Sequence, residues 1–395
     1  MIMGKGINEI VKRPEWFIKA GNIAFLIGIV LELTVMMTDH MAVWTIPYRG
    51  RITHLAFILF CIKILTNRYS KKAWVLIFCL GIVGALSYYY TRDEWLIRAV
   101  VMVIAAKDID EEKIIKICFC GALSGTIVIM GLSLLGIAGT VADIRDYGRG
   151  GVEARYCLGF NHANNVHCML WYLSALWIYL RRNALTWTDA AVILAADIGV
   201  YYLTASKTGL IATALLTIFA VILILSRKYI RVCKSISLYV LGAIGVIVSL
   251  LLTIYGSTVS IYDSRVCELL NNALNQRLNM CRILAPISEW RLFTPPIELG
   301  RALDNGLASM VIGYGIVPLM LIVLSILYLV YIAYKKSDIM MLAVAVTFTF
   351  VWFMESTFCK NESLLCTLML VLLFENWYCG ARQTDKSQGL SGGIR

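Results

Sequence analysis

The chain has 395 residues, of which 59% are hydrophobic and only 15% are charged, and its mean hydropathy is +0.76. Soluble domains contain about 45–50% apolar and about 25% charged residues. A chain this apolar lacks the polar surface that water requires. The composition therefore excludes a soluble enzyme and a disordered chain, and it indicates a membrane protein.

Apolar runs long enough for transmembrane helices follow one another along the chain, and the first lacks the cleavage site of a signal peptide. A closed barrel would need alternating segments of about ten residues, which the sequence lacks. The predicted fold is all-α and polytopic, with about twelve spans. They cover residues 16–37, 51–66, 73–90, 94–106, 114–138, 163–180, 188–204, 208–226, 235–255, 306–334, 339–355 and 363–379.

The net charge of +11 is best explained by topology. Nucleic-acid binding would need a basic, water-facing domain, and no cytoplasmic segment is long enough to form one. With both termini in the cytoplasm, 21 of the 36 lysines and arginines lie in inside segments and 13 in outside segments, as the positive-inside rule favours. We predict a single transmembrane domain over residues 1–380 and a disordered cytoplasmic tail over residues 381–395.

The outside cations are mostly arginines, eleven of the 13, whereas the inside cations are mostly lysines. Arginine carries a planar fork suited to bidentate phosphate contacts, and it keeps its charge in a dry site. Two outside loops are enlarged, at about 139–162 and 256–305. Loops of this length are usually functional unless they are disordered, and their composition is not that of disordered segments.

The first long loop ends in glycines and polar residues at the mouth of the sixth predicted span. Glycines flank Arg149, and glycine lets the backbone approach a ligand closely. Arg155 follows, and a polar run then leads into the span. This pattern predicts a binding site, although Asn and His side chains that only cap the helix would produce it too. The candidate substrate-binding residues here are Arg149, Asn161, His162 and Asn164.

Several charged residues lie within or beside the apolar runs. Lys207, in the turn between the seventh and eighth predicted spans, either contacts a ligand or extends to the membrane surface as an ordinary lysine. Carboxylates inside a membrane usually face a polar cavity or a cation. Functional groups and structural ion pairs between helices are equally consistent with these charges, which are Glu32, Arg98, Asp197 and Glu355.

The second long loop contains a predicted amphipathic helix over residues 264–282, because its apolar residues recur every three or four positions. Arg277 lies on this apolar stripe. A cation on a buried face needs a partner, such as a ligand phosphate or a carboxylate; the alternative is an interfacial helix whose arginine reaches the lipid surface. In a continuous helix Cys267 and Cys281 would be about 21 Å apart, too far for a disulfide.

The end of the second loop carries a charged triplet. Arg301, Asp304 and Asn305 are spaced so that a helical start places all three on one face. They could form only a salt bridge, or the carboxylate could orient or deprotonate an acceptor hydroxyl while arginine holds phosphate. Arg291 is a further candidate for substrate binding. The twelve cysteines include no CxxC motif and mostly lie in apolar runs, so neither a metal site nor a cofactor is expected.

These motifs, in this order, resemble the O-antigen polymerase and O-antigen ligase superfamily over nearly the whole chain. The resemblance rests on twelve spans with both ends inside, two enlarged outer loops and three short motifs. The motifs are Arg155 with Leu158-Gly159-Phe160-Asn161-His162-Ala163-Asn164, then Ser206-Lys207-Thr208-Gly209, then Leu303-Asp304-Asn305 with Gly313-Tyr314-Gly315-Ile316-Val317.

The resemblance implies a metal-independent glycosyltransferase fold of the helical membrane (type C-like) class and a glycan on undecaprenyl diphosphate as donor. It also implies outer-loop arginines that bind the diphosphate, which in this sequence are Arg155, Arg277 and Arg301. The ligase branch has a His-Asn pair where the second long loop enters its helix. This sequence has Asp304-Asn305 there, which favours a polymerase and leaves the identity of any base open.

We therefore expect a polysaccharide polymerase that makes capsule, O-antigen or another exopolysaccharide outside the bacterial cytoplasmic membrane. The implied catalytic residues are Arg155, Arg277, Arg301 and Asp304, and the implied partners are the lipid-linked glycan, the bilayer, a chain-length regulator and a flippase. The alternatives are a ligase and a lipid-linked oligosaccharide flippase. A transporter places its charges near the bilayer midplane, whereas most arginines here lie in outer loops.

Overall fold

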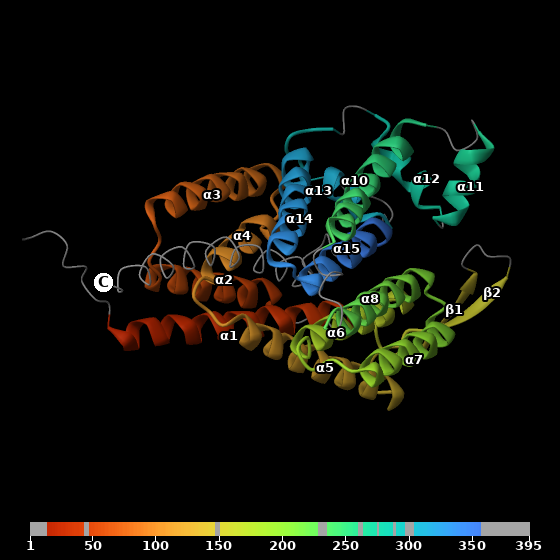
Figure 1. The fold of residues 1–395 in the computed structure, drawn as a ribbon, viewed down its shortest axis with the longest axis horizontal. Coiled ribbons are helices and arrows are strands. Elements are labelled where there is room, and N and C mark those ends of the chain that lie inside the picture. The colour runs from red at the N-terminus through yellow and green to blue at the C-terminus, as the bar shows by residue number, and fades with distance from the viewer. Residues whose placement is uncertain are drawn as a thin grey trace, which may run out of the picture.

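The computed structural model describes residues 14–42, 47–146, 151–227, 235–259, 264–274, 276–286, 290–296 and 304–356. These residues are mostly helical (Figure 1). The predicted span 363–379, the predicted tail, Arg149 and Arg301 lie outside the described residues.

The helices follow the apolar runs of the sequence closely. The first five are α1 (Glu15–Asp39), α2 (Arg49–Thr66), α3 (Lys71–Thr91), α4 (Trp95–Ala105) and α5 (Glu111–Leu134). Two strands, β1 (Ala142–Asp146) and β2 (Val152–Tyr156), precede α6 (Ala163–Leu180), α7 (Trp187–Thr204), α8 (Lys207–Ser226) and α10 (Ile236–Thr258). The rest are α11 (Arg265–Ala273), α12 (Arg277–Cys281), a 3₁₀ turn (Arg282–Leu284), α13 (Gly306–Tyr314), α14 (Ile316–Lys336) and α15 (Ile339–Met354).

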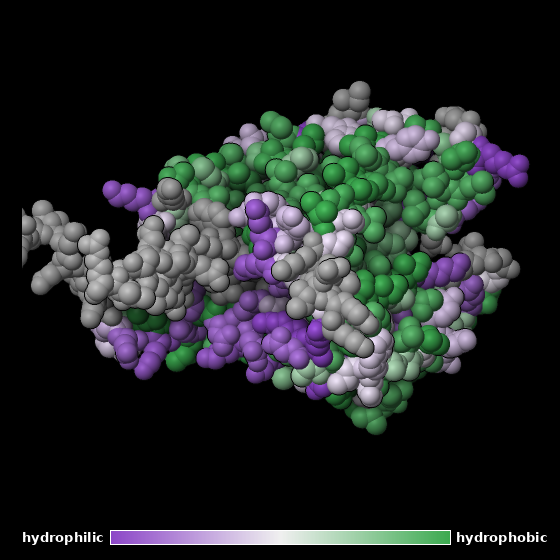
Figure 2. Space-filling view, viewed as in Figure 1, coloured by the Kyte–Doolittle hydropathy of each residue, from purple (hydrophilic) through white to green (hydrophobic). Residues whose placement is uncertain are grey.

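Six of the described helices are long and apolar enough to cross a membrane: α1, α3, α5, α8, α10 and α14. Two others, α4 and α15, are apolar but shorter. Apolar side chains cover much of the face seen in Figure 2, and many large ones are exposed, as on lipid-facing helices. The structure therefore describes a multi-pass helical membrane protein, and the count of twelve spans stays a prediction.

The first long loop departs from the all-α prediction, because it contains an antiparallel hairpin of β1 and β2. Asp143 pairs with Arg155, and Ala142 pairs with Tyr156. Both strands alternate apolar and polar residues, and the connection between them is rich in glycine, which favours a hairpin. The hairpin, α11 and α12 lie at the same end of the molecule (Figure 1), which we call the hairpin end.

Two predicted continuous helices are broken. The predicted span 306–334 divides into α13 and α14 at Gly315, whose φ is +100°. A Cβ there would lie 2.5 Å from the carbonyl oxygen of Leu292, so only glycine lets this segment approach so closely. The predicted helix 264–282 ends at Ala273 and restarts as α12 after Gln276, whose φ is +68°. Cys267 and Cys281 are free thiols, but not because one helix separates them.

The N-caps of α6, α8 and α13 are residues of the three sequence motifs. His162 caps α6, Ser206 caps α8 and Asn305 caps α13, each by accepting a hydrogen bond from a backbone amide of its own first turn. α8 packs against α6, α7 and α15, and α12 packs against α10. The motifs therefore set where these helices begin, and the packing brings those beginnings together.

Candidate functional site

Arg155 is held by the ends of two helices. It lies on β2 and is buried, with 3% of its surface exposed. Its Nε donates a hydrogen bond to the carbonyl oxygen of Thr204 at 2.5 Å, and its Nη2 donates one to Oδ1 of Asn164 at 2.7 Å. Thr204 is the last residue of α7, where carbonyl groups carry partial negative charge and favour a cation.

Arg277, from the second long loop, is held between two carboxylates. Its Nη1 donates to Oδ2 of Asp304 at 2.9 Å, and its Nη2 donates to Oε1 of Glu355 at 3.2 Å. The two acceptors differ in burial, because the Asp304 side chain is 43% exposed and that of Glu355 is 5% exposed. Arg277 itself is buried, so this pairing supplies the counter-charge that a buried cation requires.

Asn164 joins the two arginines into one polar network, which consists of Arg155, Asn164, Glu355, Arg277 and Asp304. Its amide oxygen accepts from Arg155, and its Nδ2 donates to Oε1 of Glu355 at 3.0 Å. The network thus connects the first long loop, the second long loop and the residue that follows α15. It contains two arginines and two carboxylates, so its formal charge is balanced.

A buried pair of titratable side chains lies next to this network. Nε2 of His167 on α6 is 2.6 Å from Oδ1 of Asp197 on α7, and neither side chain is exposed. Nδ1 of the same ring is 3.4 Å from the hydroxyl oxygen of Thr204, whose carbonyl holds Arg155. The sequence singled out Asp197 as a charge inside a span, and its partner proves to be a histidine from the neighbouring helix.

Two buried donors near the network have no hydrogen-bond partner among the described residues. They are Nε of Arg277 and Nδ2 of Asn305, the residue after Asp304. Buried polar groups are nearly always hydrogen-bonded, and an exception calls for a ligand or a water. Since both atoms donate, the missing partner is an acceptor, and an anion such as phosphate has that chemistry.

Other predicted site residues lie elsewhere. Asn161 donates from Nδ2 to the carbonyl oxygen of Asp39 at 3.3 Å, and its side chain also contacts Asn165. It therefore links the start of α6 to the end of α1. His162 accepts from the backbone of Asn164 at 3.1 Å, as the capping alternative expected. Lys207 and Arg291 are exposed at the start of α8 and beside Gly315.

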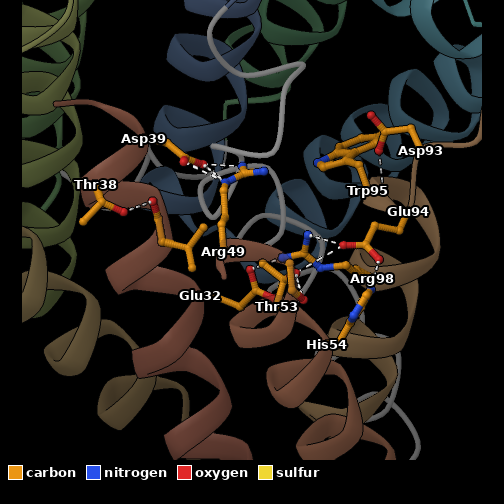
Figure 3. A network of polar contacts seen from close by, with 12 residues as sticks. Glu32, Thr38, Asp39, Arg49, Thr53, His54, Asp93, Glu94, Trp95 and Arg98 are labelled. Carbon is orange, nitrogen blue, oxygen red and sulfur yellow. Dashed lines mark hydrogen bonds and ion pairs between the residues drawn. The ribbon is translucent and has the colours of Figure 1, made fainter. Parts of the chain in front are cut away.

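A second polar cluster ties α1, α2 and α4 together (Figure 3). Arg98 contacts Glu32 on α1, and its Nη1 lies 3.3 Å from Oε1 of Glu94. Glu94 also accepts from His54, at 2.9 Å between Nε2 and Oε2. Closer to the end of α1, Nε of Arg49 donates to Asp39 at 2.7 Å, in view in the same figure. Two of the four charges that the sequence placed within or beside the spans, Glu32 and Arg98, thus form an ion pair between helices.

Sequence reasoning did not include Glu355 or His167 among the site residues. Glu355 carried a signal, because a carboxylate at the end of an apolar run is costly unless it has a partner. His167 carried less signal, because one histidine in an apolar helix has many possible partners. Within the part of the chain that the structure describes, no group of three His, Cys, Asp or Glu side chains could hold a metal ion.

Comparison of the chain with protein-family models, with curated proteins and with solved structures gave no match. The functional argument therefore rests on the residues and the geometry described above.

Proposed function

We propose that the chain is a polysaccharide polymerase of the cytoplasmic membrane. It would transfer a growing glycan from one undecaprenyl diphosphate onto the repeat unit carried by another, with the hairpin end facing outside. The observation that carries the proposal is the polar network. It unites the arginines of two loops far apart in the sequence, and two buried donors beside them find no partner among the residues that the structure describes.

The chemistry of such a donor matches what the network contains. A lipid diphosphate is already a good leaving group, so transfer needs charge stabilisation on the leaving oxygens and a positioned acceptor rather than a covalent nucleophile. Arg155 and Arg277 can supply that stabilisation without a metal, because guanidinium groups bind phosphate oxygens through two donors at once.

The unequal burial of the two carboxylates suggests how a phosphate would enter. The Asp304 side chain is 43% exposed, whereas the Glu355 side chain is 5% exposed, although both contact Arg277. An arriving phosphate would replace Asp304 on Nη1, while Glu355 keeps Nη2. Asp304 would then be released beside the acceptor, where a carboxylate can accept the proton of the attacking hydroxyl.

A flippase for the same lipid-linked glycan is a second candidate, because ion pairs lie within the helices as well as at their ends. Glu32–Arg98 joins α1 to α4, and His167–Asp197 joins α6 to α7. Charged groups at such depth commonly mark a transport pathway. The polymerase is preferred because the two arginines of the polar network, Arg155 and Arg277, lie in the long loops rather than within the spans.

The test uses cells that make the glycan, with the gene deleted and then restored as Arg277→Ala, Arg155→Ala or the control Arg265→Ala. Arg265 is an exposed arginine at the start of α11 and has no part in the network. We expect the first two variants to leave single repeat units at the cell surface, and the control to make full-length chains. Membrane protein levels are measured by immunoblot.

Other outcomes would contradict the proposal in distinct ways. Absence of any repeat unit outside the cell would indicate a flippase. Long chains that stay on the lipid carrier would indicate a ligase. Normal long chains from both network variants at normal protein level would refute a diphosphate site built on these arginines.

A further inference from the structure

The His167–Asp197 pair is the most deeply buried titratable pair in the described part of the chain, since both side chains are 0% exposed. It connects α6 to α7 at 2.6 Å. Placing a carboxylate in an apolar interior is costly, and a single partner repays only part of that cost. Oδ2 of Asp197 has no partner among the described residues, so packing stability alone does not account for this pair.

The pair reaches the polar network through a single residue. Nδ1 of His167 is 3.4 Å from the hydroxyl oxygen of Thr204, which also accepts from the amide of Ser206. The carbonyl oxygen of the same threonine accepts the Nε–H of Arg155 at 2.5 Å. Any rotation of the last turn of α7 would therefore move the acceptor that orients Arg155.

A third helix fixes the histidine ring from another side. Gly209, in the first turn of α8, faces the ring so closely that a Cβ would lie 2.3 Å from its Cγ. Only glycine leaves room for the ring at this point. Asp197, Thr204 and Gly209 thus hold the imidazole against the ends of α7 and α8, next to the start of α6.

We propose that His167 and Asp197 are positioning residues for Arg155. They fix the last turn of α7 so that the carbonyl of Thr204 and the amide of Asn164 hold the guanidinium in one orientation. Neither residue touches the reacting atoms. The role of that orientation in diphosphate binding rests on the proposed function, whereas the connection from Asp197 to Arg155 does not.

A double-mutant cycle tests the connection in the full chain, purified in detergent. The variants are Asp197→Asn, Arg155→Ala and the two combined, and the first readout is the midpoint of thermal unfolding. Residues coupled through a shared contact give non-additive effects. We expect the Asp197→Asn effect to shrink by at least half in the Arg155→Ala background. Additive midpoint shifts would overturn the proposal.

The affinity for inorganic pyrophosphate, measured by calorimetry, is the second readout, because a purely structural pair would leave it unchanged in folded protein. Asp197→Asn should weaken binding roughly tenfold in the parent and not further in the Arg155→Ala background. Equal weakening in both backgrounds would overturn the proposal. If the parent does not bind pyrophosphate but the thermal cycle is coupled, the positioning role stands and the diphosphate site fails.

Two further variants keep the test decisive. Thr204→Val removes the hydroxyl that faces His167 but keeps both charges, so it replaces Asp197→Asn in both readouts if that variant does not fold. Its effects should likewise shrink in the Arg155→Ala background, and additive effects of Thr204→Val and Arg155→Ala would overturn the proposal.

Thr213→Val is the matched control, since this α8 hydroxyl is fully buried and has no partner among the described residues. It should leave the affinity unchanged and should not lower the midpoint, because an unpartnered buried hydroxyl is itself unfavourable; a tenfold loss of affinity in it would refute the specificity of the pair.

Discussion

Arg277 has two carboxylate partners, and their different burial predicts very different costs for losing each one. Glu355→Gln leaves the buried guanidinium with one carboxylate partner among the described residues, Asp304, whose side chain is 43% exposed. Breaking a buried pair on one side costs about 3 kcal/mol, whereas losing a partner that water can replace costs about 1 kcal/mol. We therefore expect Glu355→Gln to destabilise the protein about three times as much as Asp304→Asn.

The assay is thermal unfolding of the purified protein in detergent, followed by tryptophan fluorescence. At about 2 °C per kcal/mol, Glu355→Gln should lower the midpoint by roughly 6 °C and Asp304→Asn by roughly 2 °C. Equal shifts, or a larger shift for Asp304→Asn, would refute the argument from burial.

Removing the cation should reverse the sign of the Glu355 effect. Arg277→Met leaves the Glu355 carboxylate buried, with the side chains of Asn164 and Thr208 as its hydrogen-bond partners in the described part of the chain. A buried charge without a counter-charge is strongly unfavourable, so neutralising it should then help. In this background Glu355→Gln should raise the midpoint or leave it unchanged. A further fall of several degrees would show that the carboxylate is stabilised by something other than Arg277.

Three further changes have defined outcomes. Arg277→Lys should abolish long surface glycan at normal protein level, because one ammonium cannot reproduce the fork between Asp304 and Glu355; full chain length would favour a simple point charge. Burial lowers the pKa of His40, in the loop after α1, to about 4. The unfolded chain takes up a proton below about pH 6.5 and the folded chain does not until about pH 4, so stability should fall by about 2 kcal/mol between pH 7 and 5. His40→Gln should remove that part of the pH dependence in chemical-denaturation curves, and an unchanged slope would contradict it. Gly315→Ala should lower the unfolding midpoint, because φ is +100° and a Cβ would meet the Leu292 carbonyl, whereas Gly313→Ala, where a Cβ meets nothing within 4 Å, should not; equal shifts would contradict the steric argument.

The length of the apolar runs predicted the described helices well because one physical requirement, a satisfied backbone in an apolar solvent, decides where they lie. It failed where a local backbone conformation interrupts a run. Gly315 divides a predicted span because a loop segment packs against it, and Gln276 divides a predicted amphipathic helix by adopting a left-handed conformation. The hairpin of the first loop was missed because its alternating strands are only five residues long.

The candidate site was predictable in its residue types but not in its connections. Arg155, Arg277 and Asp304 were singled out from the sequence as outward-facing charges in long loops, and the structure brings them into one network. Asn164 is the residue that joins them, by an amide that accepts on one side and donates on the other. No periodicity indicates such a bridge, because it depends on the start of α6 lying at the same place as the ends of β2 and α15.

The pairing of charges in apolar helices explains why these ends meet. Four charges stood out in or beside the predicted spans, and in the structure each contacts a partner: Glu32 with Arg98, Asp197 with His167, and Glu355 with Arg277. An isolated charge in an apolar medium is far more costly than a pair, so each charge strongly favours folds that bring its partner close. Two of these pairs join one helix to another. The third joins the residue after α15 to a loop helix and holds a cation whose remaining donor is unpartnered among the described residues, and the proposed anion site rests on that donor.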